Sequence, residues 1–430
     1  MMKDKLWVII FGLVILITTR VSAQKHQADI DTLTNRLIKE QLERTINPAA
    51  VGTFLKNMRS DGSWPDVDYK TVTARLDALE HLFRLVEISI AYRQPGSEYY
   101  NSKDIQEKLV SGLRYFSEQK PQSTNWWFNE MGGPQEYMIP LLLLKGKINK
   151  NTLHFLSKAY LEDHMDNDFY QGTNRTWVSN IAIYKGCIED DYALVLKGFK
   201  SIASTIKVAD VQGHEGIKAD NSFHMHRPQL YSGGYGRGFS DHHTRYTLLP
   251  VNTSFEQAFT AEKRAILNGL LLGGHQLFSY RKAVDFGSVG RNISRPNGIG
   301  SFSTSIMDRM ALSQPDKAKA YKLWKDHILL GTPFPVVGNK YFWKSDIMTQ
   351  HGPNYYLSAK VISTRTTGTE SINGENIFGY YLPLGATNIM THGNEYKDIF
   401  PIWNWTRIPG TTTSANRKMT ELPFYLFGSN

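Results

Sequence analysis

Residues 224–239 read HMHRPQLYSGGYGRGF and bring several reactive side chains into one short stretch. His224 and His226 stand two residues apart, and Tyr231 and Tyr235 flank a serine and two glycines. Imidazole and phenol groups serve in proteins as metal ligands or as general acids and bases. Because the stretch is too rich in glycine for a regular helix, we expect a loop that presents one of these two kinds of site.

A metal site is one interpretation of the histidines. His224 and His226 would project to the same side of an extended segment, and His242 and His243 follow in SDHHTRY. Zinc sites, however, use recurrent ligand spacings. Neither a His-Glu-x-x-His motif nor a cysteine pair occurs, and no carboxylate stands at a familiar spacing. The metal interpretation is therefore the weaker one.

Two adjacent tryptophans, Trp126 and Trp127, occur in NWWFNEMGGP. In a loop both indoles can present a face, and an indole face stacks well on the C–H face of a sugar ring. Core packing is the alternative for either residue. The pair therefore makes a saccharide one candidate ligand.

Three polar side chains could hold a carboxylate or sulfate group. Asn174, in GTNRTW, stands where an asparagine would cap a following helix, but its carboxamide could also donate to a substrate carboxylate. Arg291 and Arg295 lie four residues apart in SVGRNISRPNG. Guanidinium groups bind such anions through two parallel hydrogen bonds, although either arginine could also be an ordinary surface residue.

The polar stretch TRTTGTESINGEN, residues 364–376, adds a third group of candidates. Glu370, Asn373 and Glu375 suit a binding cleft and equally suit an ordinary turn. This stretch alone predicts little.

The motifs in their order along the chain resemble the polysaccharide lyases of the hyaluronate, chondroitin AC and xanthan lyase family, above all the chondroitin AC branch. The resemblance rests on NWW at 125–127, the asparagine of GTNRT, HRPQL with SGGYG, GRNISR, TRTTGTESINGEN, LPLGATNI and WNWTRIPGTTT. Members of this family have an α/α toroid followed by β-sandwich domains. The resemblance therefore implies the same order of folds here.

The resemblance also implies roles for individual residues, whereas His224 matches no catalytic position. The catalytic positions correspond to Asn174, His226, Tyr235, Arg291 and Glu370, and the substrate-contacting positions to Trp126, Trp127, Arg295 and Asn373.

Lyases of this kind remove the C5 proton of a uronic acid and expel the oxygen at C4. The substrate carboxylate must first be neutralised, and hydrogen bonds from Asn174 and His226 could do this. A free tyrosine has a pKa of about 10, so Tyr235 needs a cation such as Arg291 to act as the base. Glu370 would orient Arg291 or Tyr235, and Tyr235 could return the proton to the leaving oxygen. His226 as base with Tyr235 as acid is the alternative.

These inferences predict a secreted lyase that cleaves chondroitin sulfate, hyaluronan or both by β-elimination. A non-catalytic glycan-binding protein and a metal-dependent or two-carboxylate glycan hydrolase are the alternatives. Which glycosaminoglycan is cut, and whether cutting is internal or from chain ends, depends on loop shapes that the sequence leaves open. Sequence also leaves open which of His226 and Tyr235 is the base.

No cofactor is expected. Some relatives bind calcium through acidic residues in the tryptophan-rich segment after the glutamate motif. Here that segment reads WNWTR, with Asn404 and Thr406 in place of acids. Because calcium prefers charged oxygen ligands, we expect none at this point.

Apolar residues recur at helical spacing from about residue 32 to 329, which predicts an α/α toroid of helical hairpins. The clearest stretches are residues 73–93, 102–116, 153–163, 190–206, 261–278 and 316–330, with loops expected at 121–137 and 168–180.

Segments rich in β-branched and aromatic residues begin after about residue 341, and the clearest are 355–366, 376–385 and 386–393. We therefore expect an α+β chain with a toroid domain at 24–335 and a partial antiparallel β-sandwich at 336–430. The sandwich appears cut short, so the position of Glu370 and the activity of this chain come into question.

The first residues resemble a signal peptide, with a charged start, an apolar run and cleavage after Ala23. We expect a secreted or periplasmic monomer with no membrane contact after cleavage. The only cysteine, Cys187, lies in an apolar stretch and should be buried and inert. The formal charge of +9, about +7 after cleavage, favours an acidic polysaccharide partner over nucleic acid outside the cell.

Overall fold

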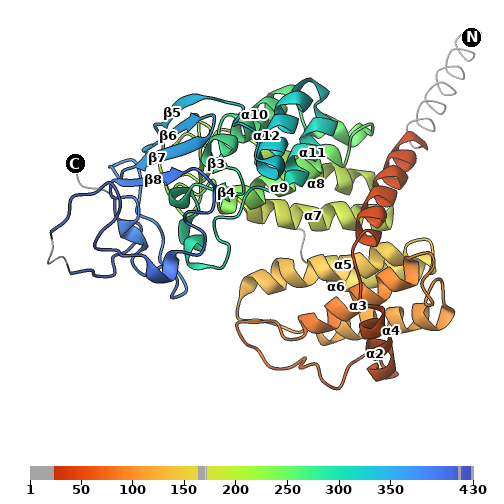
Figure 1. Ribbon diagram of the computed structural model, residues 1–430. Helices are drawn as coiled ribbons and strands as arrows, with labels where there is room; N and C mark the ends of the chain where they lie inside the picture. Colours follow the sequence, from red (N-terminus) through yellow and green to blue (C-terminus); the bar gives the residue numbers. More distant parts are fainter. Residues whose placement is uncertain (1–23, 163–169, 171, 415–417, 428–430) are drawn as a thin grey trace, which may run out of the picture. The chain divides into compact units, whose positions relative to one another are not determined.

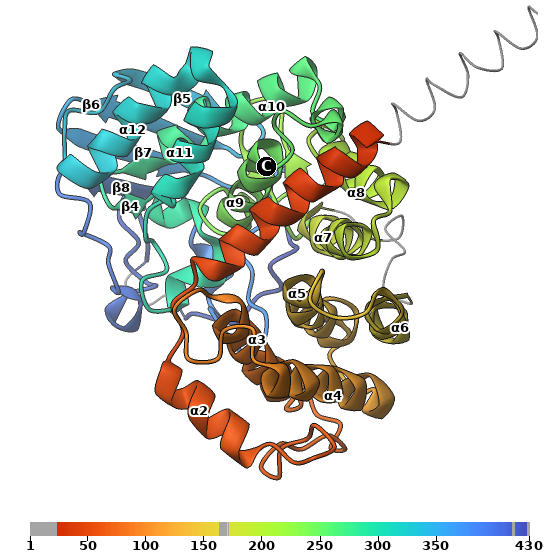
Figure 2. The same ribbon diagram turned by 90° about the vertical axis from the view of Figure 1, so that its right-hand side faces the viewer.

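The computed structural model describes residues 24–162, 170, 172–414 and 418–427. The chain forms two compact units (Figures 1 and 2). The first contains residues up to Ile202 together with Asn252–Ala258, and the second contains Ala203–Val251 and Phe259 onward. The candidate signal peptide, residues 1–23, lies outside the described part. In that part no helix combines the length and the apolar character that a membrane span needs.

The first unit is helical. After a helix at residues 24–42 it contains α2 (Pro48–Asn57), α3 (Leu79–Arg93), α4 (Lys103–Gln119), the π-helical turn η1 (Phe128–Gly132), α5 (Gly133–Leu144), α6 (Lys150–Leu161), α7 (Gly172–Glu189), most of α8 (Tyr192–Ser204) and the 3-10 turn η3 (Ser254–Ala258).

Helix α5 is the centre of this unit and contacts α3, α6 and α7. Figure 2 shows α5, α6 and α7 nearly along their axes. The helix is buried on almost every side, which agrees with its apolar sequence GPQEYMIPLLLL. A helix that is apolar all round is stable only when other helices surround it. Cys187, in α7, is also fully buried, and burial raises the pKa of its thiol to about 12, which confirms the expected inert thiol.

The second unit combines helices with short strands and a four-stranded sheet. Its elements are β1 (Gly216–Ile217), β2 (Phe223–His224), α9 (Tyr235–Leu248), α10 (Ala261–Leu272), η4 (His275–Phe278), β3 (Ser279–Tyr280), β4 (Ala283–Val284), η5 (Phe286–Ser288), η6 (Gly290–Ser294), α11 (Thr304–Ser313), η7 (Pro315–Lys317), α12 (Ala318–Leu330), β5 (Gly338–Phe342), β6 (Ile347–Gly352), β7 (Tyr355–Lys360), η8 (Gly379–Tyr381), β8 (Ala386–Met390) and η9 (Phe400–Ile402).

Strands β5, β6, β7 and β8 form the antiparallel sheet, in that order (Figure 1). Buried and more exposed residues alternate along β8, as expected when one face of a sheet is covered. Phe342 and Ile347 of the sheet pack with Leu230 and Phe278 in one buried cluster. This core fixes the segment that contains His226 and Tyr231 against the sheet.

A buried polar network joins the same sheet to the segment before η6. Asp285 is fully buried and accepts hydrogen bonds from the hydroxyl of Tyr356 at 2.9 Å, from Ser358 and from the backbone N–H of Gly287 at 2.8 Å. Lys360 donates to the carbonyl of Gly287 at 3.3 Å. Burial raises the pKa of Asp285, and these hydrogen bonds oppose the rise. The network therefore anchors the strand-to-turn connection that leads to Arg291.

The expected fold class, a helical toroid followed by an antiparallel sandwich, is confirmed by the helices, the sheet and the comparisons given below. Each of the six expected helical stretches contains a helix. The last helix ends at Leu330 and the sheet begins at Gly338, while the domain boundary expected near residue 335 stays a prediction.

Four expectations about local structure were wrong. The first turns of α7 and α9 lie in stretches expected to be loops, as do η1 and the start of α5, because tertiary contacts outweigh the weak helix propensity of glycine. Residues 376–385 were expected to form a strand but contain the turn η8. A Cβ on Gly379 would lie 2.7 Å from the carbonyl oxygen of Thr369 and 2.8 Å from that of Glu370, so the backbone passes too closely here for a larger residue.

Replacing Asp285 with alanine should lower the free energy of unfolding by about 3 kcal/mol, because two buried hydroxyls would lose their acceptor. Urea unfolding monitored by circular dichroism measures the loss. Asp308→Ala is the matched control, since that carboxylate is 53% exposed and pairs with Lys325 at the surface. Equal losses in the two variants would contradict the role assigned to the buried network.

Candidate active site

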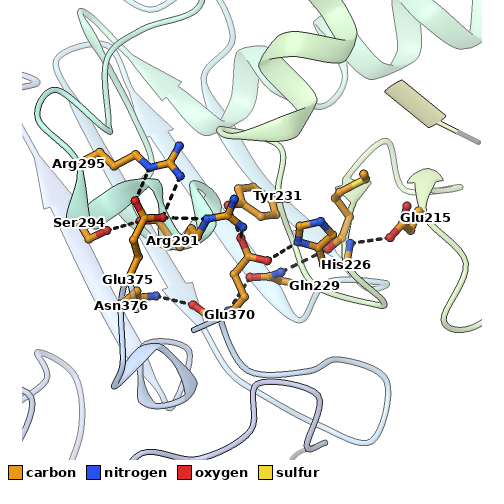
Figure 3. A network of polar contacts seen from close by, with 11 residues as sticks. Glu215, His226, Gln229, Tyr231, Arg291, Ser294, Arg295, Glu370, Glu375 and Asn376 are labelled. Atoms are coloured by element: carbon orange, nitrogen blue, oxygen red, sulfur yellow. Dashed lines mark hydrogen bonds and ion pairs between the residues drawn. The ribbon is translucent and has the colours of Figure 1, made fainter. Parts of the chain in front are cut away.

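Glu370 lies at the centre of a polar network that joins three separate segments (Figure 3). Its carboxylate is fully buried. One oxygen accepts hydrogen bonds from the Tyr231 hydroxyl at 2.7 Å and from Arg291, and the other bonds Nδ1 of His226. The backbone N–H of Glu370 donates to the side chain of Gln229 at 2.9 Å. The sequence-predicted residues His226, Arg291 and Glu370 are therefore in direct contact.

Charge balance explains how such a buried group stays ionised. Burial alone would raise the pKa of Glu370, but His226, Tyr231 and Arg291 together hold it below its ordinary value. Burial would likewise lower the pKa of Arg291, whereas the carboxylate of Glu370 and the nearby hydroxyls of Tyr231 and Tyr235 raise it. A carboxylate and a guanidinium that are buried together each stabilise the charged form of the other.

The two tyrosines of this segment differ in their surroundings. Burial, followed by the charge of Glu370, raises the pKa of Tyr231 far above its ordinary value, so its hydroxyl stays protonated and donates to that carboxylate. Tyr235, the first residue of α9, is only partly buried and lies beside Arg291. Its ring centroid is 5.0 Å from that of His226. Of the two, Tyr235 is the tyrosine available for proton transfer.

The protonation of His226 follows from its partner. A carboxylate can only accept, so Nδ1 carries the proton in the hydrogen bond to Glu370 and Nε2 is the remaining ring nitrogen. His226 and Arg227 both have positive φ, 55° and 71°, which is uncommon for residues with a side chain. The side chain of Glu215 accepts the backbone N–H of His226 at 2.8 Å and so supports this turn.

Glycines in this site make room for Tyr231. A Cβ on Gly234 would lie 2.1 Å from the Tyr231 ring, and a Cβ on Gly290 would lie 2.2 Å from it. Gly290 also has a φ of 59°. Both glycines therefore pack against the ring of a buried tyrosine, where a larger residue would not fit.

Arg295 is held by Glu375. Its Nε and one terminal nitrogen donate to the two carboxylate oxygens at 3.0 and 2.8 Å, and Arg291 also donates to Glu375 at 3.0 Å. The side chain of Arg295 is 45% exposed, so it can also meet a ligand. Asn373 is exposed at the tip of the turn, with a φ of 62°, and the structure does not bring it into the network around Glu370.

Three predicted site residues belong to the first unit. Trp126 is 48% exposed and stacks on Tyr170 with ring centroids 5.7 Å apart, while Trp127 packs edge-on against Trp177 of α7. Both tryptophans lie in helical backbone directly before η1. The expectation that they lie in a loop was therefore wrong. Asn174 lies in the first turn of α7, not before that helix. Trp126 thus retains an exposed indole suited to a sugar.

The histidines considered as metal ligands have other partners. His224 is buried and its Nε2 bonds the Ser345 hydroxyl at 2.8 Å, and His243 bonds Thr205 at 2.6 Å. Among the described residues no group of three or more His, Cys, Asp or Glu side chains is arranged to hold a metal ion.

The residues at the position of the relatives' calcium site do not fit a calcium ion. Oδ1 of Asn404 accepts both the backbone N–H and the hydroxyl of Thr406, at 3.0 and 2.7 Å. The amide oxygen is therefore already engaged within the turn, and neither residue supplies the charged oxygen that calcium prefers.

Sequence reasoning missed several supporting residues. Tyr231 was named only as a member of the reactive stretch, Glu375 was a candidate in a stretch that predicts little alone, and neither Gln229 nor Glu215 was considered. The available signal was the clustering of polar residues within HEGIK and HRPQLYSGGYG, but contacts over more than a hundred residues decide which of them matter.

Comparison with protein families gives two matches. Residues 19–328 match the N-terminal α-helical domain of polysaccharide lyase family 8, and residues 337–425 match the super-sandwich domain of the same family.

Individual relatives agree with these matches. The chain is similar to chondroitinase-AC of Pedobacter heparinus, with 29% identity over 391 residues that cover 86% of this chain and 53% of that protein. It is also 22% identical over 453 residues to hyaluronate lyase HylB of Enterococcus faecalis, covering 89% of this chain and 44% of that protein. A solved structure of chondroitinase AC lyase with oligosaccharides superposes with a TM-score of 0.82 at 25% identity, covering 94% of this chain and 60% of that one.

Replacing Glu370 with glutamine should destabilise the protein by about 3 kcal/mol near neutral pH, since Arg291 would lose its buried partner. The folded-state pKa of Glu370 lies below the ordinary value of 4.5. The contribution of ionised Glu370 to the free energy of unfolding is therefore complete above pH 4.5. It is lost as the pH falls through the folded-state pKa of this carboxyl group.

Urea unfolding of both proteins from pH 3 to 8 tests this. The difference should be constant above pH 5 and shrink below pH 4.5. Glu107→Gln, at a side chain that is 70% exposed, should show no such pH-dependent difference. A difference that grows on acidification would refute the proposed charge state.

Replacing Gly290 with alanine should cost about 2–4 kcal/mol of stability, because the new methyl group would overlap the Tyr231 ring and the backbone is left-handed. Gly374 also has a positive φ, 74°, but a Cβ there would meet no atom within 4 Å. Gly374→Ala therefore isolates the backbone effect. If the two variants lose the same stability, the contact with Tyr231 is unimportant.

Proposed function

Because the chain belongs to polysaccharide lyase family 8, we propose that it cleaves an acidic glycosaminoglycan, chondroitin sulfate or hyaluronan, by β-elimination at the uronic acid. The chain spans about half the length of the curated relatives that it matches. The names of those relatives, chondroitinase-AC and hyaluronate lyase, support the choice of substrate.

The network around Glu370 is the observation that carries this proposal. It holds an imidazole and a guanidinium beside Tyr235, with the compensating negative charge buried behind them. Elimination beside a carboxylate places further negative charge on a group that is already anionic. Positive and hydrogen-bonding groups that are fixed before the reaction lower this barrier without reorganising.

The proposed roles follow from these positions. His226 hydrogen bonds to the substrate carboxylate and so acidifies the C5 proton, which is also the role that the family resemblance implies for Asn174. Arg291 stabilises negative charge on the Tyr235 oxygen, and Tyr235 takes the proton and delivers it to the C4 oxygen. Glu370 holds His226 and Arg291 in place. Arg295 and Asn373 contact the sugars beside the uronic acid. For Trp126 and Trp127 the family resemblance implies sugar binding.

His226 is the alternative base. Its Nδ1 is paired with a carboxylate, as in histidines that accept a proton at Nε2. In that case Tyr235 would only protonate the leaving oxygen. The two assignments predict different rates for the Tyr235→Phe variant when the C4 leaving group no longer needs a proton.

We also propose that residues 1–23 direct export as a signal peptide and that the mature protein acts as a monomer outside the cytoplasm. Sequencing the N-terminus of the exported protein should give Gln24 as the first residue. An unprocessed N-terminus would contradict cleavage after Ala23.

Digestion of chondroitin sulfate or hyaluronan should release products with the ultraviolet absorbance of an unsaturated uronate. Tyr235→Phe should lower kcat about 10³-fold, as expected for loss of a general acid-base group, with KM changed only a few-fold. A chelator should leave turnover unchanged. New reducing ends without the absorbance would indicate hydrolysis, and binding without any product would indicate a non-catalytic glycan-binding protein.

A uronide whose C4 substituent leaves without protonation separates the two bases. If Tyr235 is the base, Tyr235→Phe remains inactive on this substrate. If His226 is the base, the activated leaving group restores most of the rate in Tyr235→Phe but not in His226→Ala. Rate measurements on both variants with natural and activated substrates decide between them.

A further inference from the structure

A polar cavity lies in the second unit, and none of its lining residues belongs to the network around Glu370. Its volume is about 640 Å³, which is sufficient for one or two sugar rings. Three cations, Arg237, Lys282 and Lys397, line it. Among the described residues, no carboxylate contributes to its wall.

The two lysines are presented by turns that pack tightly together. A Cβ on Gly393 would lie 2.9 Å from the carbonyl oxygen of Tyr280, so the turn before Lys397 approaches the turn before Lys282 as closely as a glycine allows. The Tyr280 hydroxyl also donates to the carbonyl of Thr391 at 3.4 Å. The backbone segments that carry Lys282 and Lys397 are therefore held close together.

Arg237 is held by carbonyl groups. It projects from α9 and donates to the backbone oxygens of Gly298, at 3.0 Å, and Gly300. Burial lowers the pKa of its guanidinium, and no acidic side chain acts to raise it. In the part of the chain that the structure describes, no carboxylate forms an ion pair with this guanidinium.

The two acidic residues nearest to Lys397 in the sequence accept hydrogen bonds from backbone N–H groups. Glu395 accepts N–H groups of Thr391, His392 and Gly393 at 2.5–2.8 Å, and Asp398 accepts the N–H of Asn297 at 2.6 Å. Although burial opposes it, these bonds lower the pKa of Glu395 to about 2. Both carboxylates thus shape the neighbouring turns and are not part of the cavity lining.

We propose that this cavity is a second, non-catalytic binding site for a sulfated saccharide, with a sulfate ester held between Lys282, Lys397 and Arg237. Hydroxyl groups of Ser301 and Thr304 on the same wall can donate to sulfate or sugar oxygens. Ala283, Ile299 and Phe302 provide an apolar surface for C–H groups. Binding of an anion follows from the lining of the cavity alone. The choice of a sulfate group on a polymer over a free anion rests on the proposed function.

Calorimetric titration of Tyr235→Phe, which should not degrade the ligand, tests this site. A sulfated chondroitin hexasaccharide should bind at two sites, and an unsulfated hyaluronan hexasaccharide at one. Adding Lys282→Gln and Lys397→Gln should weaken only the sulfate-dependent site, about fivefold from the loss of two exposed ionic contacts. Lys200→Gln with Lys319→Gln is the control of equal charge, at two exposed lysines away from the cavity.

Equal affinities of the two double variants for the sulfated ligand would overturn the proposal. Sodium sulfate that binds as tightly as the hexasaccharide would identify a free-anion site and overturn the assignment to a polymer. Because this readout is binding in a catalytically impaired background, it remains informative if the chain proves not to be a lyase. In that case unsaturated product would be absent while the sulfate-dependent site persists.

Discussion

The buried carboxylate of Glu370 is the interaction on which the candidate active site depends. It receives an imidazole, a phenol and a guanidinium from segments that lie 79–144 residues away in the chain. Without this carboxylate the buried hydroxyl of Tyr231 would lose its acceptor and Arg291 would lose a buried counter-charge, and both losses are costly. Fold and site are therefore coupled through one residue, and the segment around Glu370 must pack correctly before the remaining groups acquire their geometry.

The surrounding architecture serves this coupling. The Asp285 network and the cluster of Leu230, Phe278, Phe342 and Ile347 fix two of the three segments against the antiparallel sheet. Hydrogen bonds of Asp285 thus hold the segment before Arg291, and apolar packing of Leu230 holds the segment that contains His226 and Tyr231. Such preorganisation is what electrostatic stabilisation of a developing charge requires, because groups that must move first lose much of their effect.

The sequence predicted the long helices and the order of folds because a helical face such as that of α12 repeats within a few residues. It also identified His226, Arg291 and Glu370, which the structure brings together. It did not reveal that Tyr231 belongs with them, or that Gly234 and Gly290 exist to accommodate its ring. Those facts depend on contacts between distant segments, as does the helical start of α9, which local propensity opposes.

The bidentate contact between Arg295 and Glu375 affects how strongly Arg295 can attract an anionic ligand. An anionic group that reaches Arg295 must displace or share an internal carboxylate, so part of the attraction is cancelled before binding begins. The same carboxylate is ready to receive the guanidinium when the ligand departs. Arg295 therefore attracts an anion less strongly than an unpaired guanidinium would, and it has an internal partner to return to when that anion leaves.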